Sequence, residues 1–358
     1  MSNRSFTSLF AVAGLLAACD PPAPPARRGF YSWRTTFSLS PTERAALEQQ
    51  HVERLYLRFF DIELVQAGSG PAVPAVVAPV TLGAEPALPR GVEIVPVVFL
   101  KNQALSHLGA GGAARLAEQL FAEVEKRAAL LGAGPVRELQ LDCDWTASTR
   151  EEFFALARAV QALAYKEGAQ VSATLRLHQL KYRERTGVPP VSRGMVMLYN
   201  LAPVSGAPGA RAIYDPQIAE SYLSRMDDYP LPLDVALPLF AWTVQSRGGR
   251  VERLLDGVAE ADLAAESGWL RRTGPGRFIA QESRFFQSGF VREGDLLQAD
   301  AASPADALDA ASRAAAHLAA ARADTSTGPR TISLFDLSDR NLRRHDPASL
   351  DRLFRAIR

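Results

Sequence analysis

The chain has 358 residues, of which 47% are hydrophobic and 22% are charged, and its formal net charge is +1. This composition is ordinary for a globular protein, and the length allows a large core in one or two domains. A surface that binds nucleic acid needs an excess or a stripe of basic residues. The near-neutral charge therefore gives no reason to expect a nucleic-acid partner.

The N-terminal segment MSNRSFTSLFAVAGLLAACD has the organisation of a secretion signal. One early cation, Arg4, precedes an apolar stretch from about Phe6 to Leu16, and small residues follow it. This apolar stretch is too short for a comfortable transmembrane helix. We therefore expect residues 1–18 to be a signal peptide.

The sequence LAAC at residues 16–19 resembles the lipobox of bacterial lipoproteins. The resemblance implies cleavage before Cys19 and acylation of its thiol and new amino group. A plain signal peptide with an incidental cysteine is the alternative. Several acyl chains on one residue anchor a protein stably. We therefore expect a lipid-anchored protein of the cell envelope that faces the periplasm. Asp20 resembles the inner-membrane retention signal of enteric bacteria.

Residues 19–28 combine the expected lipidated cysteine with a proline-rich linker. Proline-rich chain favours an extended polyproline II conformation, which would hold the folded body away from the lipid. The chain has only one other cysteine, Cys143. If Cys19 is lipidated, no disulfide can form within the chain. We expect Cys143 to be a free and buried thiol.

Strand-like segments recur along the rest of the chain, and helix-like segments lie between many of them. The strand-like runs begin at Gly29, Arg54, Val92, Glu138, Gln170, Gly194, Leu233 and Thr331. Strands that alternate with helices in this way predict an α/β fold, a (β/α)8 TIM barrel over residues 29–358. A doubly wound open sheet is the alternative.

The helices carry recognisable boundary signals. Ser40 is a predicted N-cap, followed by Pro41 at the first helical position and by Glu43 three residues after the cap. Further helices are predicted over residues 112–131 and 148–168, from Ser303 onward, and in the C-terminal stretch DPASLDRLFRAIR. The segment between the second and third strands is rich in Ala, Val and Pro, and its helix is poorly marked.

Residues 243–302 do not fit the simple repeat. They contain a Gly-Pro-Gly turn and read as a small antiparallel insertion after the seventh strand. Such an insertion lies on the face formed by the C-terminal strand ends, where TIM barrels carry their sites. We expect it either to wall a cleft or to decorate the surface.

Side chains alternate across a strand, so the stretch LQLDCDW predicts which residues enter the barrel. Asp142 and Asp144 should point inward, and Cys143 should point outward. The same alternation places Ser172, Thr174, Arg176 and His178 inward in the fifth strand. It also places Met195, Met197 and Tyr199 inward in the sixth strand, and Tyr56, Arg58 and Phe60 inward in the second.

This inner wall is more polar than a purely structural barrel requires, because buried charges are costly unless they are paired. Our interpretation is that Asp142 forms an ion pair with Arg176 or Arg58. Asp144 lies one layer nearer the barrel mouth and is the better candidate for chemistry.

Other residues near strand ends are weaker candidates, each with a structural alternative. The acids are Asp61, Glu63, Asp336 and Asp339, for which loop solvation or helix capping is the alternative. Trp33, Trp145 and Trp242 end strands one, four and seven and suit sugar stacking, with core or rim packing as the alternative. His178 is either an acid–base residue or a structural histidine.

The strand sequences together resemble the chitinase-like superfamily of glycoside hydrolases. That family carries D-x-x-D-x-D-x-E on its fourth strand and Met-x-Tyr-Asp on its sixth. The last two aspartates match Asp142 and Asp144, and the tyrosine of the segment MVMLYN matches Tyr199. The seventh strand, ALPLFAW, and the insertion after it add to the resemblance, which implies a TIM barrel with a glycan-facing cleft.

Three positions depart from the family pattern. The catalytic glutamate falls on Thr146, the first aspartate falls on Leu139, and Asn200 replaces the aspartate after the tyrosine. In the family, the glutamate protonates the glycosidic oxygen, the neighbouring aspartate orients the acetamido group of the substrate, and the tyrosine helps to position it. A threonine cannot protonate a leaving group, so the resemblance does not imply chitinase chemistry.

The whole chain also resembles a family of proteobacterial lipoproteins of unassigned activity. The segments that carry this resemblance are FYSWRTTF, RLYLRFFDIE and LQLDCDWTAST. It supports the expected lipid anchor and implies no reaction.

Two functions remain open, and with them the question of whether the protein is an enzyme. In the first, the protein hydrolyses a polysaccharide, with Asp144 as general acid and Asp61 or Asp336 as base or nucleophile. Such carboxyl pairs lie about 5–5.5 Å apart in retaining enzymes and about 6.5–9.5 Å apart in inverting ones. In the second, a non-catalytic envelope lipoprotein binds glycan or acts as a scaffold. Arginines bound to both Asp142 and Asp144 would favour the second function.

The candidate site residues form two groups. Asp144, Asp142 and Tyr199 are the candidates for catalysis. The candidates for substrate binding are Arg58, Asp61, Trp145, Arg176, His178, Trp242 and Asp336. The sequence contains no HExxH, nucleophile elbow, P-loop or Rossmann glycine pattern, so we expect neither a metal nor a cofactor.

Overall fold

The computed structural model describes residues 25–66, 68–84, 89–205, 210–287, 289–320 and 328–357. The expected signal peptide and Cys19 lie outside these ranges, so their roles stay predictions. Among the described helices, none combines the length and the hydropathy that a membrane crossing requires.

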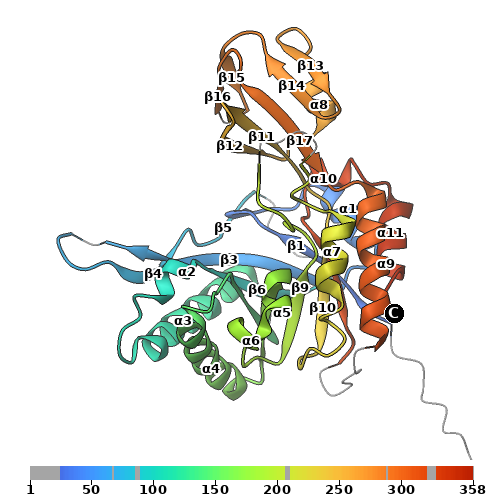
Figure 1. The fold of residues 1–358 in the computed structure, drawn as a ribbon. Coiled ribbons are helices and arrows are strands. Elements are labelled where there is room, and N and C mark those ends of the chain that lie inside the picture. Colours follow the sequence, from blue (N-terminus) through green and yellow to red (C-terminus); the bar gives the residue numbers. More distant parts are fainter. Residues whose placement is uncertain are drawn as a thin grey trace, which may run out of the picture.

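A closed barrel of parallel strands forms the body of the protein (Figure 1). The barrel strands are β1 (Arg27–Ser32), β3 (Arg54–Val65), β6 (Glu93–Leu100), β7 (Glu138–Cys143), β8 (Gln170–Arg176), β9 (Arg193–Met197), β10 (Leu233–Pro238) and β18 (Thr331–Phe335). Strand β1 pairs with β18 on one side and with β3 on the other, which closes the sheet. The predicted (β/α)8 TIM barrel is confirmed, and its closure excludes the doubly wound open sheet.

Helices that connect the strands cover the outside of the barrel (Figure 1). They are α1 (Pro41–Gln49), α2 (Asn102–Leu105), α3 (Gly112–Leu131), α4 (Arg150–Lys166), α5 (Leu177–Lys181), α6 (Arg183–Thr186), α7 (Pro216–Leu223), α9 (Pro304–Ala320), α10 (Asp339–Leu342) and α11 (Pro347–Arg355). The capping box predicted for α1 is present. The Ser40 hydroxyl accepts from the Glu43 amide at 3.1 Å, and the Glu43 carboxylate accepts from the Ser40 amide at 3.0 Å.

Strands replace the poorly marked helix between the second and third barrel strands. Within residues 68–84, β4 (Val73–Val77) pairs antiparallel with β3, and β5 (Thr81–Leu82) pairs with β2 (Thr36–Phe37). Pro71, Pro74 and Pro79 explain the absence of a helix in this segment, because a proline in a helix interior costs about 3 kcal/mol.

The insertion after β10 is a separate small sheet that stands away from the barrel body (Figure 1). Its elements are β11 (Ala241–Arg247), β12 (Arg250–Asp256), α8 (Glu260–Ala264), β13 (Leu270–Gly274), β14 (Arg277–Ala280), β15 (Arg284–Phe286), β16 (Gly289–Val291) and β17 (Leu296–Ala301). Five of its strands form a sheet in the order β12-β11-β17-β14-β13. Trp269, Phe278 and Leu297 belong to a core of its own.

The base of the insertion is tied to the barrel by buried polar contacts. The Asp300 carboxylate accepts hydrogen bonds from the amides of Ala212 at 2.7 Å and Ile213 at 2.9 Å, on the loop after β9. Arg344, after α10, donates to the carbonyl of Gly257 at 2.5 Å. These contacts fix β17 and the end of β12 beside the barrel mouth.

The barrel begins inside the segment that the sequence assigned to the linker. Arg27 and Arg28 are the first residues of β1, and Arg27 pairs in register with Thr331. Arg28 forms an ion pair with Asp351 at 2.9 Å, and its guanidinium lies over the Phe354 ring. The linker prediction was therefore wrong for these two arginines, because they are held by sheet pairing and ion pairs.

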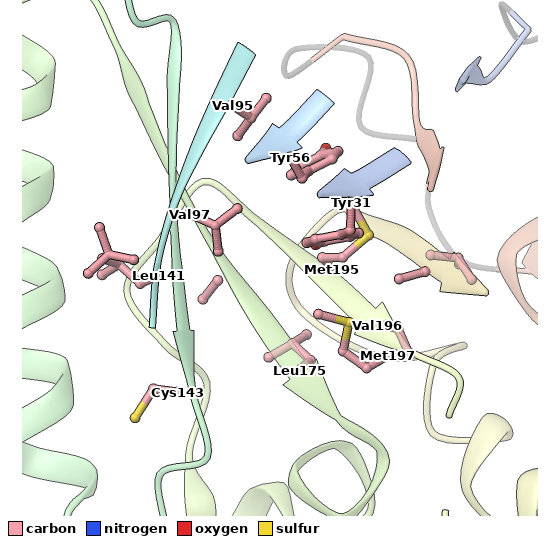
Figure 2. Close-up of a cluster of buried hydrophobic side chains, with 14 of the residues drawn as sticks. Tyr31, Tyr56, Val95, Val97, Leu141, Cys143, Leu175, Met195, Val196 and Met197 are labelled. Carbon is pink, nitrogen blue, oxygen red and sulfur yellow. The ribbon is translucent and has the colours of Figure 1, made fainter. Parts of the chain in front are cut away.

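Side chains fill the interior of the barrel below its mouth. Arg54 forms an ion pair with Glu138 at 2.6 Å, and both side chains are almost completely buried. Above this pair, the Tyr31 ring stacks on Tyr56 with centroids 4.8 Å apart (Figure 2). Cys143 is a free, buried thiol among the hydrophobic core residues. A ligand can therefore approach only at the upper end, where the strands finish.

The Arg54–Glu138 pair generates a stability prediction. Arg54→Met leaves the Glu138 carboxylate buried without its cation, so we expect a loss of about 3–5 kcal/mol in the free energy of unfolding. The double variant Arg54→Met, Glu138→Gln should recover most of this loss, because it buries no unpaired charge. Urea unfolding followed by circular dichroism measures both.

Arg355→Met is the matched control, since Arg355 pairs with Asp351 at 2.5 Å while 72% exposed. An exposed pair contributes about 0–1 kcal/mol, so this variant should unfold almost like the wild type. Equal losses in Arg54→Met and Arg355→Met would contradict the assigned importance of the buried pair.

Candidate functional site

A cavity of about 320 Å³ lies where the barrel strands end, beside the base of the insertion. Its lining residues come from seven barrel strands or the loops after them, and from β11 and β12. They are Trp33, Phe99, Asp142, Arg176, Tyr199, Asn200, Phe240, Trp242, Asp256, Phe335 and Asp336. The volume is in the range of small-molecule and cofactor sites, and this end of a TIM barrel is where its chemistry is found.

Aromatic rings form a continuous wall of this cavity. Phe335 lies at the centre, with ring centroids 5.8 Å from Trp33, 5.0 Å from Tyr199 and 5.6 Å from Phe240. The chain of rings extends from Phe240 to Trp242, with centroids 5.4 Å apart. Such a wall offers flat apolar faces to a ligand while remaining rigid, because each ring contacts another ring.

Asp142 enters the cavity from the end of β7 and is 3% exposed. Its Oδ1 accepts a hydrogen bond from the Thr174 hydroxyl at 2.5 Å and lies 3.9 Å from the Arg176 guanidinium. Burial raises the pKa of Asp142, and Arg176 and Thr174 oppose this change. The predicted inward direction and the predicted contact with Arg176 are both present in the structure.

Asp144 makes the stronger contact with the same arginine. Arg176 Nε donates to Asp144 Oδ1 at 2.5 Å, while the Asp144 side chain is 51% exposed. One guanidinium thus links the carboxylates that the sequence singled out. Asp144 therefore serves as a hydrogen-bond acceptor for the guanidinium.

Tyr199 and Asn200 follow β9 and line the cavity next to Arg176. The Tyr199 ring is buried, and its hydroxyl donates to the sulfur of Met197 at 2.9 Å. Burial raises the pKa of Tyr199 well above its usual value, so the phenol stays protonated. Asn200 has a φ of 56°, a left-handed conformation that asparagine tolerates better than most residues.

Asp336 and Asp256 bring further carboxyl groups to the cavity. Asp336 follows β18, and Asp256 ends β12 of the insertion. Burial and repulsion from Asp256 raise the pKa of Asp336 to about 6, with Arg34 opposing. Asn341 donates to the side chain and the carbonyl of Asp336, which holds the carboxyl in place. Asp336 is thus a carboxyl group that changes charge near neutral pH.

A change of register in β3 determines where Arg58 and Asp61 lie. Arg58 is opposite Val97, whereas Phe60 is already opposite Val98, so one extra residue interrupts the alternation. Asp61 then lies opposite Phe99, a cavity residue, and forms an ion pair with Arg58 at 2.6 Å. The expected inward position of Phe60 was therefore wrong, and the candidates Arg58 and Asp61 pair with each other without lining the cavity.

Two other predicted binding residues also lie away from the cavity. Trp145 is completely buried; its ring stacks on Phe153, and its Nε1 donates to the Thr186 carbonyl at 2.8 Å. His178 is not on the fifth strand, because β8 ends at Arg176 and His178 belongs to the exposed face of α5. Trp145 thus packs in the core, which was the alternative to sugar stacking, and the expected inward position of His178 was wrong.

Of the remaining weaker candidates, some line the cavity and the others make structural contacts elsewhere. Trp33 and Trp242 line the cavity, as their positions at strand ends suggested. Glu63 pairs with Lys101 at 2.6 Å, and Asp339 accepts a hydrogen bond from Ser40. Thr146 is exposed, and its hydroxyl lies 2.9 Å from that of Ser148. The threonine at the family's glutamate position therefore belongs to the turn before α4.

Phe99, Phe240, Phe335 and Asp256 are cavity residues that the sequence did not single out. The three phenylalanines sit at or beside the ends of predicted strands, which was an available signal. Asp256 carried no such signal, because only the folded insertion brings it to the barrel mouth. Within the described part of the chain, no group of three His, Cys, Asp or Glu side chains is arranged to hold a metal ion.

No protein-family model matches the sequence, and no curated protein matches it. Solved structures are similar in fold. The spore cortex-lytic enzyme SleL of Bacillus cereus is 14% identical, with a TM-score of 0.51 over 94% of this chain and 75% of that chain. SleL of Bacillus megaterium is 12% identical, with a TM-score of 0.52 over 95% and 76%. A chitinase of Chromobacterium violaceum is 14% identical, with a TM-score of 0.52 over 92% and 98%.

At these identities the similarity establishes the fold alone. The chain shares the TIM-barrel fold of these enzymes, and the predicted resemblance is confirmed for the fold. The roles of individual residues follow from the cavity of this protein and not from its structural neighbours.

The pKa of Asp336 generates a prediction about stability and pH. The folded protein keeps a proton on Asp336 up to about pH 6, whereas the unfolded chain loses it near the ordinary value of 3.8. The free energy of unfolding therefore falls as the pH rises through this window. Asp336→Asn should remove the part of this pH dependence that comes from Asp336. We expect that part to be about 1 kcal/mol after allowance for solvent screening at the cavity.

Asparagine is chosen because its side-chain oxygen can still accept the hydrogen bond from Asn341. Urea unfolding between pH 4 and pH 7 measures how the free energy of unfolding of each variant depends on pH. Glu282→Gln, at an exposed position of the insertion, is the control and should leave the pH slope unchanged. Identical slopes for Asp336→Asn and the wild type would show that the Asp336 pKa is not raised.

Proposed function

We propose that this protein is a cell-envelope lipoprotein that binds a glycan chain at the mouth of its chitinase-like barrel. The observation that carries the proposal is the aromatic wall of the cavity. Trp33, Phe335, Tyr199, Phe240 and Trp242 are connected ring by ring and all border the same space. Apolar sugar faces stack on such rings, and tryptophan adds a polar N–H edge for the hydroxyl groups.

The residues at and after the end of the fourth strand, β7, favour binding without chitinase-type hydrolysis. The position of the family's acid is Thr146, an exposed turn residue with no proton to give a leaving group. Asp144, the sequence-based candidate for that role, is bonded to Arg176. Arg176 also lies near Asp142, so both predicted catalytic carboxylates are held by one arginine. This is the arrangement that we expected of a binding protein.

Hydrolysis by another carboxyl is the second candidate function, and Asp336 supports it. A general acid must hold a proton near the working pH, and a pKa of about 6 allows this. Asp256 and Asp142 border the same cavity and would be the candidates for the second carboxylate. In this alternative the catalytic acid is Asp336, in place of Asp144.

The envelope location rests on the sequence of the N-terminal segment. The lipobox-like LAAC at residues 16–19 would give an acylated Cys19, and the prolines that follow would extend between lipid and barrel. Because the barrel starts at Arg27, the tether between Cys19 and the folded body is short. The mouth lies at the opposite end of the strands from Arg27, so a glycan bound there would lie on the side of the barrel away from the tether.

The glycan proposal predicts which variants lose binding. Trp242→Ala and Trp33→Ala should each weaken binding to an envelope glycan by about tenfold, because each removes a stacking face. Tyr165→Ala is the matched control, since Tyr165 is 80% exposed on α4 and away from the cavity. A glycan array followed by isothermal titration calorimetry measures these affinities.

The same incubations distinguish binding from hydrolysis. Released reducing ends that disappear in Asp336→Asn but persist in Asp144→Asn would favour the second function. Glycan binding with no released ends would favour the first. If no envelope or capsular glycan binds, or if Tyr165→Ala weakens binding as much as the cavity variants, the proposed function is wrong.

The anchor generates a separate prediction. Cys19→Ser should move the protein from the membrane fraction to the soluble fraction, because the serine hydroxyl cannot receive the thioether-linked lipid. Cys143→Ser tests the specificity of the effect, since this thiol is buried in the barrel wall. Fractionation with detergent extraction gives the result. An unchanged distribution in Cys19→Ser would contradict lipidation.

A further inference from the structure

We propose that the cavity selects a glycan whose sugar carries a free ammonium group, that is, a de-N-acetylated amino sugar. This inference rests on the proposed function and specifies its ligand class. Two independent features of the cavity point to a cation: the balance of charge on its walls and the arrangement of its aromatic rings.

The charge of the cavity walls is dominated by carboxyl groups. Asp142, Asp256 and Asp336 line the space, and among the described residues Arg176 is the only cationic one in the lining. The charge of Arg176 is already offset, because its guanidinium is bonded to Asp144 and lies near Asp142. An incoming ligand therefore meets acceptors and negative charge without a free cation to balance them.

Neighbouring arginines do not supply that cation. Arg34, which influences Asp336, is bonded to Glu43 at 3.0 Å. Arg340 donates to the carbonyl of Asp256 but lines a different cavity, beside α1. Within the described part of the chain, the cavity carboxyl groups consequently have no ion-pair partner other than the shared Arg176.

The aromatic wall also favours a cationic ligand. The face of an aromatic ring carries partial negative charge and attracts an ammonium group, most strongly when the ring is tryptophan. Trp33 and Trp242 both belong to the ring chain, with Phe335 and Phe240 between them. A box of rings with carboxylates at its edges is a general arrangement for binding ammonium groups.

An amino sugar satisfies both features at once. Its ring can stack on the aromatic wall, while its ammonium group donates charge-assisted hydrogen bonds to the carboxylates. An N-acetylated sugar offers the same ring but a neutral amide, so it leaves the negative charge of the cavity unbalanced. The difference between these two sugars is therefore the direct test.

The experiment compares glucosamine oligomers with N-acetylglucosamine oligomers of equal length, at pH 7. Quenching of tryptophan fluorescence reports binding, because Trp33 and Trp242 border the cavity. We expect the wild-type protein to bind the glucosamine oligomer at least about tenfold more tightly, and to lose this preference as salt rises. Methylammonium alone should bind much more weakly than the oligomer.

Variants test the residues responsible. Asp256→Asn should reduce affinity for the glucosamine oligomer by about tenfold and leave the N-acetylated oligomer unaffected. Asp256 is exposed at a strand end, so this change should not prevent folding. Glu282→Gln removes a carboxylate of the insertion outside the cavity and should change neither affinity.

Each outcome supports or overturns the inference. Equal or tighter binding of the N-acetylated oligomer would overturn it while leaving the proposed glycan function intact. Equal binding of methylammonium and the glucosamine oligomer would also overturn it, because the site would then recognise a small cation and not a sugar. If neither oligomer nor any other glycan binds, the proposed function itself fails.

Discussion

The contact between Arg176 and two carboxylates organises the mouth of this barrel. Asp142 lies on β7 and Asp144 lies just beyond its end, and both contact the same arginine. Without a cation between them they would repel each other in a partly buried position, which is costly. The guanidinium at the end of the next strand removes that repulsion. It also binds Asp144 and lies near Asp142, so that Asp336 and Asp256 remain as the cavity carboxyl groups without an ion pair to Arg176.

Much of the fold could be predicted from the sequence because the physical signals were local. The strand-like runs and the capping box at Ser40 depend on side-chain alternation and on hydrogen bonds within a few residues. The failures involved contacts over longer distances. Arg27 and Arg28 looked like linker residues, yet β18 and α11 hold them in a strand. The segment before β6 became strands, because its prolines exclude a helix and β3 offers a pairing edge.

The candidate site was predictable only where the alternation of strands was regular. Alternation correctly brought Asp142 and Arg176 together, and both line the cavity. It failed at β3, where one extra residue moves Asp61 to the inner face and pairs it with Arg58. It also failed for Trp145, because the chain leaves β7 before that residue and turns its ring into the helix layer. No sequence pattern marks such departures from regular geometry.

The insertion contributes one residue, Asp256, whose influence extends beyond its own contacts. Because its charge helps to raise the pKa of Asp336, the protonation of a barrel residue depends on the position of a module outside the barrel. The contacts of Asp300 and Arg344 at the base of the insertion thereby act on the chemistry of the mouth without touching a ligand. The pKa of Asp336 at the barrel mouth thus depends on both the barrel and the insertion. A chain that kept the barrel but lost the insertion would keep the aromatic wall up to Phe240 and would have a different proton affinity at Asp336.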